Sequence, residues 1–214
     1  VHALPSVQTL QDYTPPITTR VYAGNGTVLG EYARERRIFI PATFIPKLVK
    51  EAFTSAEDRN FYSHPGIDPS GILRAAIKDV GLVLQSRRPQ GASTITQQVA
   101  RNFLLNSEVK FSRKIREAIL AVRIDATYPK EKVLELYLNE IYLGQNCYGI
   151  GAATLNYFGK SLDELSIAEV AFLAALPKGP ANYDPRRYHQ AAVDRRNWVI
   201  SQMHDNGYIT DEQE

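Results

Sequence analysis

The sequence predicts a mainly α-helical fold preceded by a short N-terminal β-hairpin. Apolar residues recur every three to four positions through most of the chain after Pro46, which is the spacing of one helix face. An Asn-Gly pair separates two runs of β-branched and aromatic residues near the start, which is typical of a hairpin. We therefore expect an arm and hairpin over residues 1–45 and a helical domain over residues 46–214.

Composition limits the classes of protein that the chain can belong to. Its 214 residues are 44% hydrophobic and 22% charged, as in ordered globular domains with a core. The 25 Lys and Arg nearly balance the 23 Asp and Glu, so nucleic acid is not an expected partner. The longest apolar run, Val170 to Leu176, is far shorter than the roughly 20 residues of a membrane-spanning helix. A single cysteine, Cys147, offers no intrachain disulfide and is expected to be a small buried residue.

The N-terminal segment reads as an arm followed by strands. Residues 1–17 contain Pro5, Pro15 and Pro16 and show no periodic pattern. The predicted strands are Thr18 to Tyr22 and Thr27 to Tyr32, with Asn25-Gly26 in the turn between them. Residues 36–40 are expected to add a third short strand.

Seven helices follow from the apolar spacing and from residues that begin or end helices. We expect them at about residues 46–57, 68–84, 94–104, 112–127, 130–139, 167–176 and 190–205. Asp68 and Ser93 are the expected caps of the second and third helices. Ser166 and Glu169 have the spacing of a capping box, and Asn206-Gly207 is expected to close the last helix.

Two adjacent acids lie where the first helix is expected to end. The partial negative charge of a helix C-terminus, together with the neighbouring acid, should raise the pKa of Glu57 or Asp58, which suits a general base. The alternative is a solvated acidic turn in which Asp58 pairs with Arg59. His64, in the turn that follows, is by itself more typical of a hydrogen-bonded turn residue than of a catalyst.

The third predicted helix carries an uncharged polar face. Thr94, Gln97, Gln98 and Arg101 follow each other at intervals of one, three or four residues and share one side of the helix. Hydrogen-bonding groups followed by one arginine fit a sugar and phosphate surface, and the helix start would present backbone N–H groups to an anion. The alternative is a polar face turned to solvent.

The fourth predicted helix opens with two cations and one acid. Glu117 lies four residues after Arg113 and three after Lys114, so the three side chains can touch. Ordinary ion pairing on a helix explains this pattern. The functional alternative is that Arg101, Arg113 and Lys114 form a cationic cup for a phosphate-bearing substrate, with Glu117 acting inside it.

Five ordered motifs together resemble the peptidoglycan glycosyltransferase domain of class A penicillin-binding proteins and monofunctional transglycosylases. The resemblance covers residues from about 18 to 209. The motifs are Glu57-Asp58 with Phe61, His64 and Gly66; Gly91 with Ser93-Thr94-Ile95-Thr96-Gln97-Gln98; Arg113-Lys114 with Glu117; Lys132-Val133-Leu134-Glu135-Leu136-Tyr137-Leu138-Asn139; and Arg195-Arg196 with Val199 and Met203.

The resemblance implies a lysozyme-like helical body with a small membrane-facing jaw lobe at about residues 68–90. Residues 46–214 would form the glycosyltransferase domain, and a transpeptidase domain, absent from this chain, would be expected to follow. The implied location is the periplasmic side of the bacterial cytoplasmic membrane, with an N-terminal anchoring helix missing from this chain. The apolar stretch Ile72 to Leu84, followed by Arg87-Arg88, agrees with contact to anionic lipid head groups. The alternative is that this stretch packs inside a soluble core.

The implied reaction is polymerisation of lipid II into β-1,4-linked glycan by inverting single displacement. Glu57 would be the general base and Glu117 would act near the departing pyrophosphate. A separation of about 6.5 to 9.5 Å between the two carboxylates is expected, as in inverting hydrolases. Glu117 would order either a divalent ion, Mg²⁺ or Mn²⁺, or the neighbouring cations, and no organic cofactor is expected. The implied partners are lipid II, the growing lipid-linked chain, the membrane surface and wall-synthesis proteins.

The resemblance also assigns binding and supporting residues. The implied substrate-binding residues are Ser93, Thr94, Gln98, Arg101, Asn102, Lys110, Arg113 and Lys114, and the supporting residues are Asp58, Phe61 and His64. The chain departs from the family at Val109, where a cation is usual, and Lys110 follows it. Two other functions remain open: a lysozyme-like muramidase, for which a cationic cup is not needed, and a non-catalytic membrane-surface module, which intact Glu57 and Glu117 disfavour.

Overall fold

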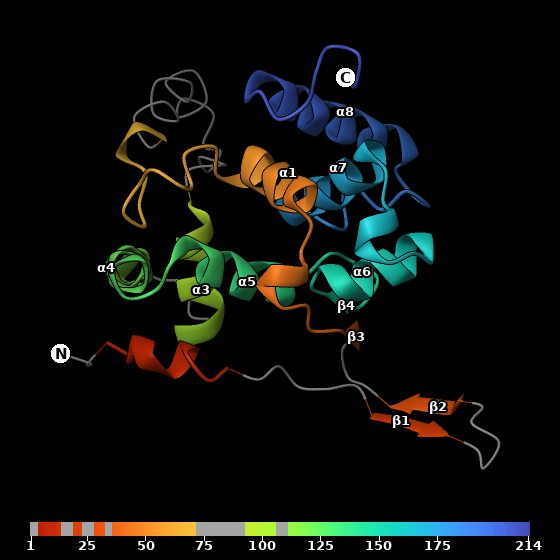
Figure 1. The fold of residues 1–214 in the computed structure, drawn as a ribbon. Helices are drawn as coiled ribbons and strands as arrows, with labels where there is room; N and C mark the ends of the chain where they lie inside the picture. Colours follow the sequence, from red (N-terminus) through yellow and green to blue (C-terminus); the bar gives the residue numbers. More distant parts are fainter. Residues whose placement is uncertain (1–3, 14–18, 23–27, 33–35, 72–92, 106–110) are drawn as a thin grey trace.

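The computed structural model describes residues 4–13, 19–22, 28–32, 36–71, 93–105 and 111–214. The chain is mostly helical (Figure 1), as the apolar spacing predicts. The α-helices with described bounds are α1 (Lys47–Glu57), α3 (Ile95–Leu104), α4 (Phe111–Thr127), α5 (Lys130–Glu140), α6 (Ile150–Phe158), α7 (Ile167–Ala175) and α8 (His189–Asp205). Short 3₁₀ turns occupy Val7–Leu10, Ala42–Phe44, Leu162–Glu164 and Leu176–Lys178.

The helices pack in two groups that meet around α1 and α5. In one group α7 contacts both α1 and α8, and in the other α3 contacts both α4 and α5 (Figure 1). Aromatic side chains fill the space between the groups: Phe53 of α1 packs edge-on against Tyr137 of α5, and both are almost fully buried. Burying side chains of this size supplies the main stabilisation of such a body.

The strands form two small, separate sheets. Strands β1 (Thr19–Tyr22) and β2 (Val28–Tyr32) pair antiparallel, as expected, and their turn lies outside the described residues. The expected third strand is shorter than predicted: β3 is Arg36–Arg37. It pairs in parallel with β4 (Cys147–Tyr148) instead of extending the hairpin. The pairing is anchored by Arg37, which is buried and ion-paired with Glu140 of α5.

Helix ends mostly follow the predicted signals. Ser166 and Glu169 make the expected capping box at the start of α7. The expected cap of α3 is corrected by one residue: Thr94, not Ser93, accepts the hydrogen bond from the Gln97 N–H at 3.1 Å. Helix α6 was not predicted from the sequence.

The second predicted helix is described only at its start. Residues 69–71 are helical, and the Gly71 N–H donates to Asp68 Oδ1 at 2.9 Å, so Asp68 caps this helix as expected. The rest of the predicted jaw lobe, including residues 72–90, lies outside the described residues. Among the described helices, none is both long and apolar enough to cross a membrane.

Candidate active site

Glu57 is the last residue of α1, where the sequence places it. Its side chain is half-buried, and Gln98 Nε2 of α3 donates to Glu57 Oε2 at 3.4 Å. Burial raises the pKa of Glu57 to about 7, against the opposing effects of the Gln98 hydrogen bond and of the nearby charges of Arg195 and Lys178. The predicted direction of this shift is therefore confirmed, but its main cause is desolvation. The charge of Asp58 adds a smaller rise.

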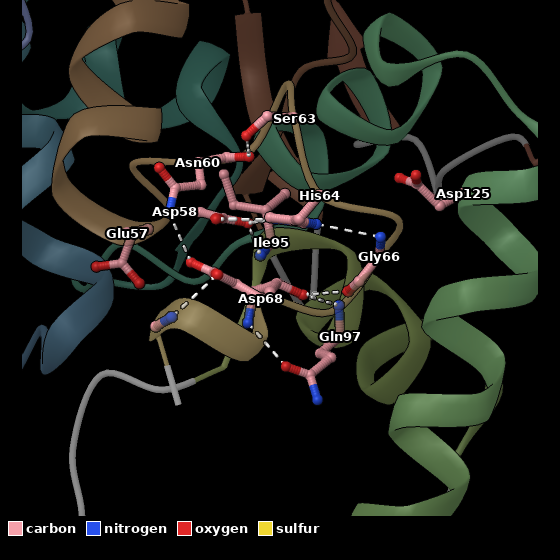
Figure 2. A network of polar contacts seen from close by, with 12 residues as sticks. Glu57, Asp58, Asn60, Ser63, His64, Gly66, Asp68, Ile95, Gln97 and Asp125 are labelled. Carbon is pink, nitrogen blue, oxygen red and sulfur yellow. Dashed lines mark hydrogen bonds and ion pairs between the residues drawn. The ribbon is translucent and has the colours of Figure 1, made fainter. Parts of the chain in front are cut away.

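Asp58 points away from Glu57 into a buried network (Figure 2). His64 Nε2 lies 2.9 Å from both Asp58 oxygens, and the Ile95 N–H donates to Asp58 Oδ2 at 2.9 Å. The Gly66 N–H donates to His64 Nδ1 at 3.1 Å, so the ring proton is on Nε2 and is donated to Asp58. The alternative in which Asp58 lies in solvent and pairs with Arg59 is therefore wrong. His64 is a hydrogen-bonded turn residue, as its sequence context indicated.

The start of α3 is occupied by groups from the chain itself. The backbone N–H of Ile95 binds the carboxylate of Asp58, and the Thr94 hydroxyl donates to the Gly66 carbonyl at 2.6 Å. A negative charge at a helix N-terminus is favourable. The N–H of Ile95, at the first position of α3, therefore meets an internal carboxylate and is not free for the substrate anion that the sequence suggested.

The loop between Asp58 and Gly66 also contacts α4 and α5. Gly66 has a φ of +88°, and a Cβ there would lie 2.4 Å from the Ala121 carbonyl oxygen of α4, so only glycine allows this close approach. Lys130 of α5 donates to the His64 carbonyl at 2.7 Å, and its ammonium lies 4.9 Å from the centre of the buried Phe61 ring. Phe61 and His64 therefore fix the loop that follows Glu57.

Glu117 lies inside a cationic cluster on α4. Its side chain is buried, with Lys114 Nζ at 2.9 Å from Oε2 and Arg113 Nε at 3.4 Å from Oε1. Lys114 Nζ also donates to Ser93 Oγ at 2.6 Å. The predicted contact among Arg113, Lys114 and Glu117 is confirmed, and burial of the acid distinguishes the cluster from ordinary surface ion pairs.

One short segment connects the two acidic centres. Ser93, just before α3, contacts the cationic cluster, while Gln98, in the second turn of α3, contacts Glu57. Five residues span about one and a half turns of helix, so Glu57 and the cations face the same end of α3. Arg101 is half-buried, Asn102 is exposed, and Lys110 lies outside the described residues. The predicted distance between the two carboxylates stays a prediction.

The residues around Glu117 do not fit a metal held by the protein. Both Glu117 oxygens are engaged by the cations of Arg113 and Lys114. Within the described ranges, no group of three or more His, Cys, Asp or Glu side chains is arranged to hold an ion. Divalent ions prefer several oxygen ligands, so no step of the chemistry is assigned to a metal here.

Two cations near Glu57 were missed as site residues by sequence reasoning. Lys178 follows α7 and Arg195 lies on α8, and burial lowers the pKa of both side chains, while the negative charge of Glu57 opposes this. The Arg195 guanidinium stacks 3.8 Å from the centre of the Trp198 ring. Its Nε is buried and has no hydrogen-bond partner within the described part of the chain. Arg195 was present in the fifth motif, but nothing in its spacing indicates contact with a residue on α1.

Replacing Lys178 with methionine should raise the pKa of Glu57 above about 7, because one of the charges that favour its carboxylate is removed. Carboxyl ¹³C NMR of the labelled protein, followed against pH, measures this directly. Lys160→Met is the matched control, since Lys160 pairs with Glu169 at 2.7 Å and is not among the charges that shift Glu57. An unchanged or more acidic midpoint in Lys178→Met would contradict this placement.

Comparisons with known proteins relate this chain to one family. A family model described as Transglycosylase matches residues 25–204. The chain is 51% identical over 207 residues to penicillin-binding protein 1A of Rickettsia felis, covering 97% of this chain and 26% of that protein. Against penicillin-binding protein 1A of Escherichia coli, identity is 47% over 210 residues, with 98% and 24% covered.

A solved structure is also similar to this chain. The crystal structure of penicillin-binding protein 1A from Haemophilus influenzae matches with a TM-score of 0.51 and 26% identity, covering 92% of this chain and 19% of that chain. The chain spans about a quarter of the length of the curated relatives. With most of its length matched by one family model, the chain belongs to the transglycosylase family and is a peptidoglycan glycosyltransferase domain of the class A penicillin-binding protein type.

Proposed function

We propose that this domain polymerises lipid II at the outer face of the bacterial cytoplasmic membrane, with Glu57 as the general base. The observation that carries the proposal is a half-buried Glu57 whose pKa is about 7, linked through α3 to the cations around Glu117. A base is most effective when its pKa lies near the working pH. The cations supply charge where a diphosphate would depart.

The proposed reaction joins two lipid-linked sugars. The 4-hydroxyl oxygen of the acceptor sugar attacks the anomeric carbon of the donor from the face opposite the diphosphate. Glu57 takes the hydroxyl proton as the new carbon–oxygen bond forms. The bond to the diphosphate breaks and its electron pair leaves with the lipid diphosphate, so the α-linkage of the donor becomes a β-1,4-linkage.

The cationic cluster has a defined part in this scheme. Arg113 and Lys114 would bind the departing diphosphate, because guanidinium and ammonium groups make strong charge-assisted hydrogen bonds to phosphate oxygens. Glu117 contacts both cations and would hold them in place before the substrate arrives. Preorganised charge of this kind needs no rearrangement when the leaving group departs.

Incubation of the purified chain with lipid II tests the proposal. Long glycan that a muramidase can digest is the expected product, and parallel reactions with and without added Mg²⁺ measure the contribution of a divalent ion. Shortening of preformed glycan would instead assign muramidase activity. Turnover of neither substrate would leave a non-catalytic membrane-surface module, and either result would overturn the proposal.

A further inference from the structure

Tyr137 buries a hydroxyl group that makes no hydrogen bond. The side chain belongs to α5, is 1% exposed, and packs edge-on against Phe53 of α1 with the ring centres 6.4 Å apart. Its oxygen has no hydrogen-bond partner within the described part of the chain. A buried hydroxyl without a partner costs folding free energy, and phenylalanine would fill almost the same space without that cost. The hydroxyl therefore needs an explanation other than stability.

The hydroxyl of Tyr137 lies beside the proposed general base. Phe53 and Glu57 are four residues apart on α1 and share one face of that helix, so the ring that packs against Phe53 stands next to the end of α1 that carries Glu57. Burial raises the pKa of Tyr137 well above its ordinary value, and among the nearby charges that of Glu57 has the largest effect and raises the pKa further. Tyr137 is therefore a neutral hydroxyl donor at neutral pH.

The carboxylate of Glu57 has room for a second donor. Within the described ranges its one side-chain hydrogen bond comes from Gln98 Nε2 at 3.4 Å, which is long beside the roughly 2.7 to 2.9 Å of a strong bond between an N–H group and a carboxylate. A carboxylate in a partly desolvated site needs donors to stay ionised. Because one long contact holds the side chain, Glu57 can turn toward α5 when it loses its proton.

We propose that Tyr137 is a positioning residue whose hydroxyl donates a hydrogen bond to the ionised Glu57 carboxylate and so favours the form that acts as the base. This inference rests on the proposed function, in which Glu57 is the base. Charged groups from several elements also act on this pair: Lys178 after α7, Arg195 on α8, Asp58 beside Glu57, and Arg101 on α3. Replacing Tyr137 with phenylalanine leaves all four charges in place, so the variant isolates the hydroxyl.

Titration of the free protein tests the hydrogen bond without any lipid II. In Tyr137→Phe, carboxyl ¹³C NMR should show the pKa of Glu57 higher by about one unit, the usual effect of one hydrogen bond to a charged group. At about pH 5, where Glu57 keeps its proton, the urea midpoint of this variant should equal or exceed that of the wild type, because no hydrogen bond is lost there.

Tyr157→Phe is the matched control for this variant. The Tyr157 hydroxyl donates to the Leu143 carbonyl at 2.7 Å, and Tyr157 is not among the groups that shift the pKa of Glu57. Its urea midpoint should therefore fall, because a buried acceptor loses its donor. The titration of Glu57 should stay in place. The two tyrosine variants are thus expected to have opposite effects on stability and on the pKa of Glu57.

Polymerisation of lipid II separates the proposed role from simple packing. A rise of about one unit in the pKa of Glu57 lowers its ionised fraction near pH 7 from about one half to about one tenth, so kcat/KM should fall about fivefold there. The rate should return to within about twofold of the wild type near pH 9, where Glu57 is ionised in both proteins. A loss of the same size at every pH would assign the hydroxyl to packing alone and overturn the proposal.

Failure of this inference is distinguishable from failure of the proposed function. An unchanged titration of Glu57 in Tyr137→Phe, or a urea midpoint clearly below that of the wild type at about pH 5, would overturn the role of the hydroxyl and leave Glu57 as the base. Failure of the proposed function would appear in Glu57→Gln, which would then keep its kcat on lipid II whatever the titration of Tyr137→Phe shows.

Discussion

Replacing Glu57 with glutamine should lower the kcat for polymerisation of lipid II by a factor of about 10² to 10⁴, the usual contribution of a general base. Glutamine has nearly the same shape and can still contact Gln98, but it cannot accept a proton from the acceptor hydroxyl. Substrate affinity should change little, because the cations that would bind the diphosphate are left in place. Single-turnover rates and equilibrium binding of lipid II measure the two effects separately.

Glu51→Gln is the matched control for this substitution. Glu51 lies on the same helix and pairs with Lys47 at 3.2 Å, and it is absent from the charges that shift Glu57. Its kcat should stay within about twofold of the wild type, as expected for loss of a surface ion pair. A Glu57→Gln enzyme that keeps more than about a tenth of the wild-type kcat would exclude Glu57 as the base.

The Glu57→Gln substitution should also change how the free energy of unfolding depends on pH. The folded protein keeps a proton on Glu57 up to a pKa of about 7, whereas the ordinary value is 4.5. The folded state thus binds more protons than the unfolded state in this range, so the wild-type free energy of unfolding should fall as the pH rises from 4.5 to about 7. Urea unfolding of Glu57→Gln should show a smaller fall over the same range.

Replacing Asp58 with alanine should lower the free energy of unfolding by about 3 kcal/mol, because buried donors are then left without an acceptor. Those donors are the ring N–H of His64 and the backbone N–H of Ile95. Activity should fall as well, since the loop after Glu57 loses its connection to α3. Urea unfolding and kcat on lipid II measure the two losses.

Two further variants serve as controls for the predicted loss of stability in Asp58→Ala. Asp58→Asn keeps one good acceptor oxygen, so its stability should lie between those of the wild type and Asp58→Ala. Asp211→Ala removes a highly exposed partner of His204 and should change stability by less than about 0.5 kcal/mol. A stability of Asp58→Ala equal to that of the wild type would show that the Asp58 network does not hold the site together.

The long amphipathic helices were predictable from the sequence alone. Apolar spacing and the stop at Pro129 place α4 and α5 to within one residue at each end, since these signals are local. Helix α6 was missed because Ile150–Phe158 is almost uniformly apolar and lacks a polar face to mark a period. Glycines flank this helix, with φ of +80° at Gly149 and +64° at Gly159. In the sequence, such glycines indicate a turn as readily as the ends of a helix.

The site was predictable in its residue types but not in its burial. The polar face of α3 is not turned to solvent: Thr94, Gln97 and Gln98 are all buried. Whether these side chains are buried depends on contact with the loop from Asp58 to Gly66, about thirty residues earlier in the chain. No local sequence pattern indicates such a contact. Lys178 and Arg195 were missed for the same reason, because they reach Glu57 only through the packing of α7 and α8 against α1.

The pH dependence of kcat/KM for wild-type polymerisation tests the central claim most directly. A base with the pKa of Glu57 should give a rising limb with a midpoint near 7. The midpoint should move to higher pH in Lys178→Met and stay in place in Lys160→Met. A midpoint near 4.5, the ordinary value for a glutamate, or a rate that does not change through neutrality, would contradict the assignment of Glu57 as the base.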